Sequence, residues 1–156
     1  MGIALTLQNY LEDRHVDYGT LTHRFADTAT ECAETAHISG ERMAKAVILK
    51  DDEGYLMAVL PATYHVDFDT LRQRLGRDVQ LVDEDELKPL FDDCEIGAIP
   101  PLGVAYGLHS IVETSLVEKG DLYFEAGDHK TLVHMQAEAF GELLGAAERG
   151  RFGFHD

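Results

Sequence analysis

The spacing of apolar residues changes several times along the chain, and each change marks a new predicted element. Apolar residues recur at helical spacing over 3–11, which predicts an amphipathic helix that ends before Val16. A short strand with its exit loop is predicted over 18–25. Thr28 and Glu31 have the spacing of a capping box, so a second helix should begin there.

After residue 43 the pattern becomes that of β-strands. Two short apolar runs, 46–49 and 55–60, flank a polar turn at 51–54 that ends in glycine. Two such runs around such a turn predict a β-hairpin. Lys45 then stands at the entrance of the first strand of this hairpin.

The rest of the chain alternates short helices and strands. Three helices are predicted: the first over 68–75, ended by Gly76, the second from the capping-box pair Asp83 and Glu86 to 91, and the third over 137–144. Strands are predicted over 79–82, 109–112, 121–125 and 131–135. The tail 149–156 is predicted to be peripheral. The hairpin and the late group of strands favour an α/β fold with a mixed sheet over a purely parallel one.

Length and composition limit the class of protein. A chain of 156 residues can bury one core and is short for two, so 1–156 is expected to be a single domain. It has no apolar stretch of the length that a membrane helix needs, and Met1–Asn9 lacks the features of a secretory signal, so a cytoplasmic location is expected. Cys32 and Cys94 lie far apart without a CxxC motif, which indicates reduced, structural thiols.

The formal net charge of -16 argues against tight nonspecific binding of nucleic acid, whose phosphates are bound by Lys and Arg. Any contact with a nucleic acid should therefore be short and local. Arg72, Arg74 and Arg77, together with Lys88, form the one modest basic cluster in the sequence and are the first candidates for a phosphate contact.

Several familiar kinds of active site lack support in the sequence. His129 and His134 lie five residues apart beside Asp128, which matches no metal-binding motif, so no metal is expected. No serine lies in GxSxG, and Cys94 sits among acidic residues that should raise its pKa, so covalent catalysis is not expected. No phosphate-binding GxxxxGK[ST] motif occurs, and no cofactor is indicated.

Three segments in a fixed order carry a family resemblance. They are the lysine-bearing strand entrance Met43–Val47, the loop Gly97–Gly103 with its adjacent prolines, and the turn Ala126–His129. Together they resemble the YbaK family of tRNA-editing domains, which includes free-standing aminoacyl-tRNA deacylases and the editing insertion of bacterial prolyl-tRNA synthetases. The resemblance implies a mixed, partly barrel-like β-sheet flanked by helices.

The resemblance also implies a function, namely the hydrolysis in trans of mischarged aminoacyl-tRNA, a translation quality-control reaction. The substrate would be bound by its 3′ aminoacyl-adenosine end, a synthetase or an elongation factor could be a further partner, and neither membrane nor DNA is involved. The family's characteristic lysine falls on Lys45, and its GxxxP loop falls on Gly97 to Pro101. Some members carry an acidic residue near Val133 and His134, a difference that leaves the preferred amino acid open.

An aminoacyl ester is already activated, so the enzyme needs to position water and to stabilise the developing oxyanion. Lys45 and the backbone of Gly97 and Ala98 are the expected catalytic groups, because a glycine admits close approach and the amides from 97 to 99 can donate. The expected substrate-binding residues are Ile99, Pro100, Pro101, Gly127, Asp128 and His129.

Each feature also has a plainer interpretation. A lysine at a strand edge most often extends to solvent, and a Gly-Pro-Pro loop is most often a rigid connection. The alternative function is a non-catalytic module of the same fold that binds tRNA or a small ligand.

Overall fold

The computed structural model describes residues 3–24, 33–34, 36, 38–118, 120–145 and 147–155. The capping box at Thr28 and Glu31 and most of the second helix lie outside these residues. Among the described residues, eight strands form one mixed sheet. Their spatial order is β1 (Gly19–Thr22), β8 (Thr131–Gln136), β7 (Asp121–Glu125), β2 (Met43–Asp51), β3 (Gly54–Pro61), β6 (His109–Glu113) and β9 (Glu148–Gly150), and the short β5 (Gln80–Leu81) also pairs with β2.

This arrangement confirms the predicted α/β class with a mixed sheet flanked by helices. Strands β2 and β7 run parallel, as do β3 and β6, whereas β7 and β8 run antiparallel. Within the described ranges the end strands β1 and β9 do not pair with each other, so the sheet does not close into a barrel. A separate two-stranded sheet joins β4 (Tyr64–Val66) to β10 (Gly153–His155).

The predicted hairpin is present and longer than expected. Strands β2 and β3 pair from Ala44↔Pro61 to Asp51↔Gly54, which leaves a two-residue turn. The Asp51 carboxylate accepts the backbone N–H groups of Glu53 and Gly54, and Gly54 has φ 140°, a value that glycine adopts without strain. Local turn chemistry therefore fixes the register that places Lys45 on β2.

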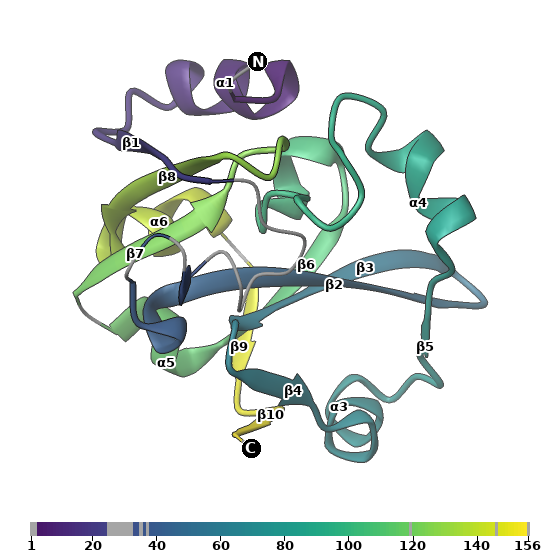
Figure 1. Cartoon of the computed structure of the whole chain (residues 1–156). Helices are drawn as coiled ribbons and strands as arrows, with labels where there is room; N and C mark the ends of the chain where they lie inside the picture. Colours follow the sequence, from purple (N-terminus) through teal and green to yellow (C-terminus); the bar gives the residue numbers. More distant parts are fainter. Residues whose placement is uncertain are drawn as a thin grey trace.

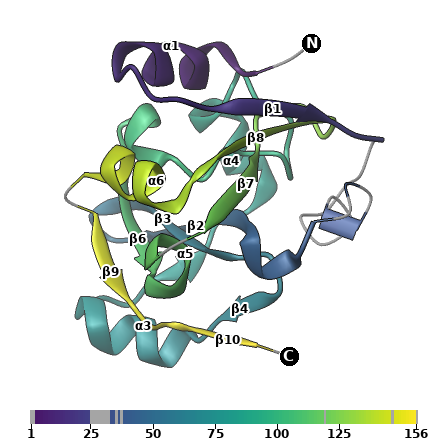
Figure 2. The same ribbon diagram turned by 90° about the vertical axis from the view of Figure 1, so that its left-hand side faces the viewer.

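Helices cover the sheet on two sides. They are α1 (Leu5–Asp13), α3 (Phe68–Leu75), α4 (Glu84–Leu90), α5 (Thr114–Glu118) and α6 (Ala137–Leu144), with 3-10 turns η1 (Gly40–Arg42) and η2 (Gly103–Tyr106). The larger core includes buried side chains of α1 and α6, and a smaller one lies beneath α3. Helices α1 and α3 lie at opposite ends of the molecule in both views (Figures 1 and 2).

The C-terminal tail is not peripheral, so that prediction was wrong. Strand β9 pairs with β6, β10 pairs with β4, and Phe152 between them is 1% exposed. The buried carboxylate of Glu113 accepts the N–H groups of Phe152 and Gly153, at 2.9 and 3.0 Å. Apolar burial and two charge-assisted hydrogen bonds hold the tail against the sheet.

Only half of the predicted capping box at Asp83 and Glu86 forms. The Glu86 carboxylate accepts a hydrogen bond from the Asp83 backbone N–H, but the Asp83 side chain makes no capping hydrogen bond. The Glu86 carboxylate also accepts from Lys50 Nζ at 2.6 Å and from the Tyr55 hydroxyl at 3.0 Å. Glu86 therefore joins the start of α4 to the hairpin.

Candidate active site

The site begins with an opening in the sheet beside β2. One edge of β2 is paired with β3, but on the other edge β7 pairs only with Met43 and Ala44, and β5 pairs only with Leu49 and Lys50. Residues 45–48 lie between these two partners. The Ile48 carbonyl accepts the Val82 N–H at 3.2 Å across this edge. Backbone direction alternates along a strand, so the N–H and C=O of Ala46 face the same opening.

A pocket of about 280 Å³ occupies this opening. Its wall combines the edge of β2, the segment that leads into α4, the loop after α4 and the end of β7, contributed by Ala44, Lys45, Ala46, Val47, Ile48, Leu81, Val82, Glu84, Leu87, Ile96, Gly97, Ile99 and Glu125. The structure therefore brings Lys45 together with two residues of the predicted loop, Gly97 and Ile99. The volume lies just below the usual range for ligand sites, roughly 300–1,000 Å³.

Lys45 is half-buried, and its ammonium is oriented by the backbone. Its Nζ donates to the carbonyl of Ala62 at 3.2 Å, just beyond the end of β3. Ala62 is itself fixed, because its N–H donates to the Met43 carbonyl at 2.7 Å. The amine is thus held against the backbone just beyond β3, while the residue lines the pocket.

The loop after α4 contributes less than its whole length to the pocket. Gly97, with φ 92°, is exposed and lines the wall, whereas Ala98, Pro100 and Pro101 are buried and do not. Three amides were expected to donate to the substrate. One of them, the Ala98 N–H, instead donates to the Glu95 carbonyl within the loop, at 3.0 Å. The Gly97 and Ile99 amides make no hydrogen bond to any described residue.

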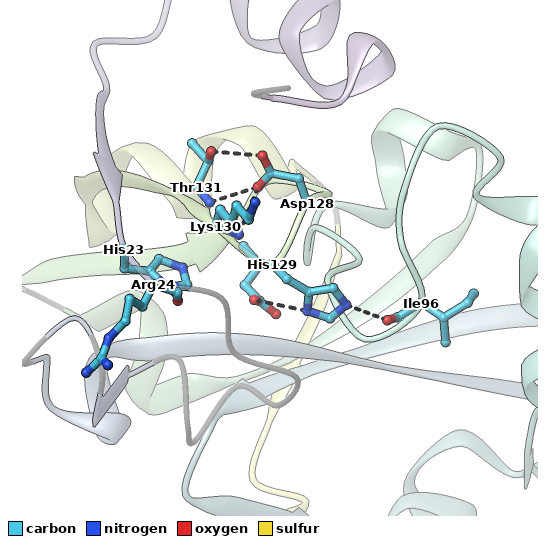
Figure 3. A network of polar contacts seen from close by, with 8 residues as sticks. His23, Arg24, Ile96, Asp128, His129, Lys130 and Thr131 are labelled. Atoms are coloured by element: carbon cyan, nitrogen blue, oxygen red, sulfur yellow. Dashed lines mark hydrogen bonds and ion pairs between the residues drawn. The ribbon is translucent and has the colours of Figure 1, made fainter.

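The turn Gly127–His129 lies behind the loop and holds it. The Gly127 carbonyl accepts the Glu95 N–H at 2.8 Å, and His129 Nε2 lies 2.8 Å from the Ile96 carbonyl (Figure 3). Because a carbonyl can only accept, His129 Nε2 carries the proton. None of the three turn residues lines the pocket. The turn therefore supports the loop and is not part of the pocket wall.

The turn is itself well braced. The Asp128 carboxylate accepts the N–H groups of Lys130 and Thr131 and the Thr131 hydroxyl, at 3.1, 2.8 and 3.0 Å (Figure 3). His129 has φ 50°, an uncommon value for a residue with a side chain. The hydrogen bonds of Asp128 stabilise a backbone conformation that directs His129 toward the loop.

Glu125 is a pocket residue that the sequence analysis did not single out. Its side chain is 5% exposed, and Oε1 lies 3.9 Å from His129 Nδ1. It is the last residue of a predicted strand, immediately before the Ala126–His129 turn, and alternation along that strand gives it the opposite face from the core residue Phe124. That combination is the signal that could have found it.

The three arginines of the predicted basic cluster are paired with acidic neighbours. Arg72 lies 3.4 Å from Asp78, Arg74 lies 3.7 Å from Glu148, and Arg77 contacts both Asp51 and Glu53, at 3.2 and 2.7 Å. None of these arginines lines the pocket beside Lys45. The three arginines are therefore weak candidates for binding tRNA phosphates.

Other reactive groups lie away from the pocket. Burial raises the pKa of the Cys94 thiol to about 12, and its sulfur lies 3.1 Å from the Tyr106 hydroxyl, so the thiol is not activated. Among the described residues, His, Cys, Asp and Glu side chains form no group of three or more that could hold a metal ion. Within the described ranges, no helix is both long and apolar enough to cross a bilayer.

Solved structures share this fold at low sequence identity. A candidate trans-editing enzyme for prolyl-tRNA synthetase superposes with a TM-score of 0.81 at 19% identity, over 97% of this chain and 96% of that one. Hypothetical protein APE2540 gives 0.84 at 18%, over 96% and 99%. A candidate signal transduction protein from Marinobacter aquaeolei VT8 gives 0.75 at 24%, over 96% of this chain and 30% of that longer one. No curated protein matches the chain.

A family model supplies the assignment that these distant likenesses do not. The model of the aminoacyl-tRNA editing domain matches residues 23–143, which include Lys45, the Gly97 loop and the Ala126–His129 turn. The chain therefore belongs to the aminoacyl-tRNA editing domain family.

Proposed function

We propose that this protein is a trans-acting deacylase, which hydrolyses the ester bond of a mischarged aminoacyl-tRNA without a metal ion. The observation that carries the proposal is one pocket, walled jointly by Lys45, Gly97 and Ile99, at the opening in the sheet. The 3′ aminoacyl-adenosine end of the tRNA would enter this pocket. The highly acidic chain then needs to contact only a short part of the tRNA.

Hydrolysis of an ester places negative charge on the carbonyl oxygen, and the pocket offers donors for that charge. The Lys45 ammonium is a positive charge already held in place by Ala62, so it needs little reorganisation when the oxyanion forms. The amides of Gly97 and Ile99, which also line the pocket, are further donors. The buried prolines and the bond from Ala98 to Glu95 keep these amides in position.

The nucleophile in this proposal is water. The described residues that line the pocket carry neither a hydroxyl nor a thiol, and their ionisable groups are Lys45, Glu84 and Glu125. A water molecule would attack the ester carbon, the bond to the ribose oxygen would break, and that oxygen would take up a proton. The ribose hydroxyl next to the ester helps to activate the water, so the substrate supplies part of the catalysis.

A panel of mischarged tRNAs, scored for release of the amino acid, tests the proposal. Wild-type protein should release at least one amino acid, and Lys45→Ala should lower kcat/KM by about 10²-fold to 10³-fold, the usual effect of losing one oxyanion donor. Lys45→Met, which keeps the apolar stem of the side chain, should be equally impaired, because the charge is what matters.

Lys50→Ala is the matched control. Lys50 lies on the same strand, half-buried and paired with Glu86, but outside this pocket. Its activity should remain within about twofold of wild type, as expected when a surface ion pair is lost. Activity of Lys45→Ala within about threefold of wild type, under roughly 0.7 kcal/mol, would exclude a central role for this lysine.

The same panel decides between an enzyme and a binding module. A module would bind the tRNA end in this pocket without turnover. Measurable tRNA binding together with no release from any member of the panel would favour the module.

A further inference from the structure

We propose that Glu125 binds the α-ammonium group of the substrate's amino acid and so selects esters that carry a free amine. This inference rests on the proposed deacylase function and adds a specificity-determining residue to it. It starts from the register of the sheet. Ala44 of β2 pairs with Phe124 of β7 in a parallel ladder, at the point where the two strands separate.

The next residue on each strand is Lys45 on β2 and Glu125 on β7. Residues at the same level of parallel strands project to the same face of the sheet. Both residues line the same pocket. The pocket wall therefore presents a cation and a carboxylate on one face of the sheet, just where the two strands diverge.

An aminoacyl ester has a matching pair of charges. Its ammonium group is attached to the carbon next to the carbonyl, and the carbonyl oxygen becomes negative as water attacks. If Lys45 stabilises that oxygen, the ammonium lies close by and needs an acceptor of opposite charge. Two carboxylates stand among the described residues of this pocket: Glu125 is buried, and Glu84 is exposed at the rim.

Burial makes this carboxylate a strong acceptor for such a ligand. With 5% of its side chain exposed, little water competes for the charge, and an ion pair is worth more there than at the surface. A carboxylate has about four lone-pair sites, so an ammonium can bind beside the contacts that the side chain already makes.

His129 lies beside the acid without donating a hydrogen bond to it. Its Nε2 proton is committed to the Ile96 carbonyl, and Nδ1 lies 3.9 Å from Glu125 Oε1, too far for a hydrogen bond. In the neutral ring Nδ1 carries a lone pair and brings no positive charge.

The consequence is selection against esters that lack a charged amine. In a peptidyl-tRNA the same nitrogen is acylated and neutral, and in an α-hydroxyacyl ester it is replaced by oxygen. A site built to bind a polar group rejects analogues without it, because its own buried group loses a partner. The pocket should thus hydrolyse aminoacyl esters in preference to both.

Two esters of the same tRNA test this directly. The first is the aminoacyl-tRNA that the panel shows to be hydrolysed fastest, and the second is its α-hydroxy counterpart, made from it by deamination with nitrous acid. Wild-type protein should favour the aminoacyl ester in kcat/KM by about tenfold or more, the value of one charge-assisted hydrogen bond. Glu125→Gln should bring this ratio within about twofold of unity and change hydrolysis of the hydroxy ester by less than about threefold.

Glu84→Gln is the matched control, because it removes the same charge from the exposed rim of the same pocket. Its preference for the aminoacyl ester should equal that of wild type. Equal losses on both esters in Glu125→Gln would overturn the inference, since they would show that Glu125 acts through Lys45, the loop or the water. A wild-type protein without preference would overturn it as well.

A measurement on wild type alone covers the case in which Glu125→Gln does not fold. The ratio of kcat/KM for the aminoacyl ester to that for the hydroxy ester should fall as pH rises through the pKa of the substrate amine, about 8, because the amine then loses its charge. A ratio that is independent of pH would contradict the inference. If wild type hydrolyses neither ester, the deacylase proposal fails separately, and equal affinities for the two tRNAs would then overturn amine recognition too.

Discussion

Replacing His129 with alanine should loosen the Gly97 loop, because this side chain ties the loop to the start of β8. His129 is 6% exposed, and its Nε2 donates to the Ile96 carbonyl at 2.8 Å. Ile96 and Gly97 both belong to the pocket wall. The substitution should therefore affect both the stability of the protein and the geometry of its pocket.

The expected loss of stability can be built from separate contributions. Losing the hydrogen bond and leaving the Ile96 carbonyl without its donor should cost about 1–2 kcal/mol. The space left by the imidazole adds about 1 kcal/mol. Alanine keeps a Cβ, so the strain of φ 50° is not relieved. The sum of about 2–3 kcal/mol is well below the roughly 5–15 kcal/mol of a typical domain, so the variant should still fold.

Urea unfolding followed by circular dichroism measures this loss. With a slope of about 2 kcal/mol per molar urea, the midpoint should fall by about 1–1.5 M. His129→Gln, whose amide can reach as far as Nε2, should recover part of the loss. The folded alanine variant should also show reduced kcat/KM for the deacylation, because a displaced loop misplaces the Gly97 amide.

His134→Ala is the control for the loss of a histidine near β7 and β8. His134 is half-exposed, stacks on Tyr123 and lies 3.2 Å from Asp121. Its midpoint should shift clearly less than that of His129→Ala. If the two variants unfold at the same urea concentration, or if His129→Ala loses less than about 0.5 kcal/mol, the reasoning that His129 holds the loop is refuted.

Two further predictions concern stability. Glu113→Ala should lower the free energy of unfolding by about 2–4 kcal/mol, because the N–H groups of Phe152 and Gly153 lose a buried acceptor. The control is Glu118→Ala, which removes an exposed ion pair with Arg151 and should change the urea midpoint far less. Equal shifts of the midpoint would contradict the role of Glu113. Burial raises the pKa of the Cys94 thiol from about 9 to about 12, so the folded state holds this proton more tightly and stability should fall as pH rises from 9 toward 12. Unfolding midpoints across this range should decline less in Cys94→Ala, and identical declines would refute the assignment.

Much of the fold follows from local sequence. The β2–β3 hairpin was predictable because a polar turn ending in glycine separates two apolar runs, and α3 was predictable because Gly76 ends it with φ 67°. These signals depend on neighbouring residues alone. Contacts between distant segments were not predictable in this way: Glu86 binds Lys50 and Tyr55 of the hairpin as well as the start of α4. The strands of the tail have three residues each, too few for a periodic pattern.

The sequence by itself determined the residue types available for the chemistry: a lysine at the start of a strand and a glycine loop stiffened by two prolines. Only the tertiary structure decided which of them meet. Lys45 and Gly97 share a wall because β2 leaves β7 after Ala44 and joins β5 at Leu49. The same divergence adds Glu125 and leaves the Gly127–His129 turn behind the loop. Strand pairing is a contact between residues far apart in the chain, so no local pattern specifies where a sheet opens.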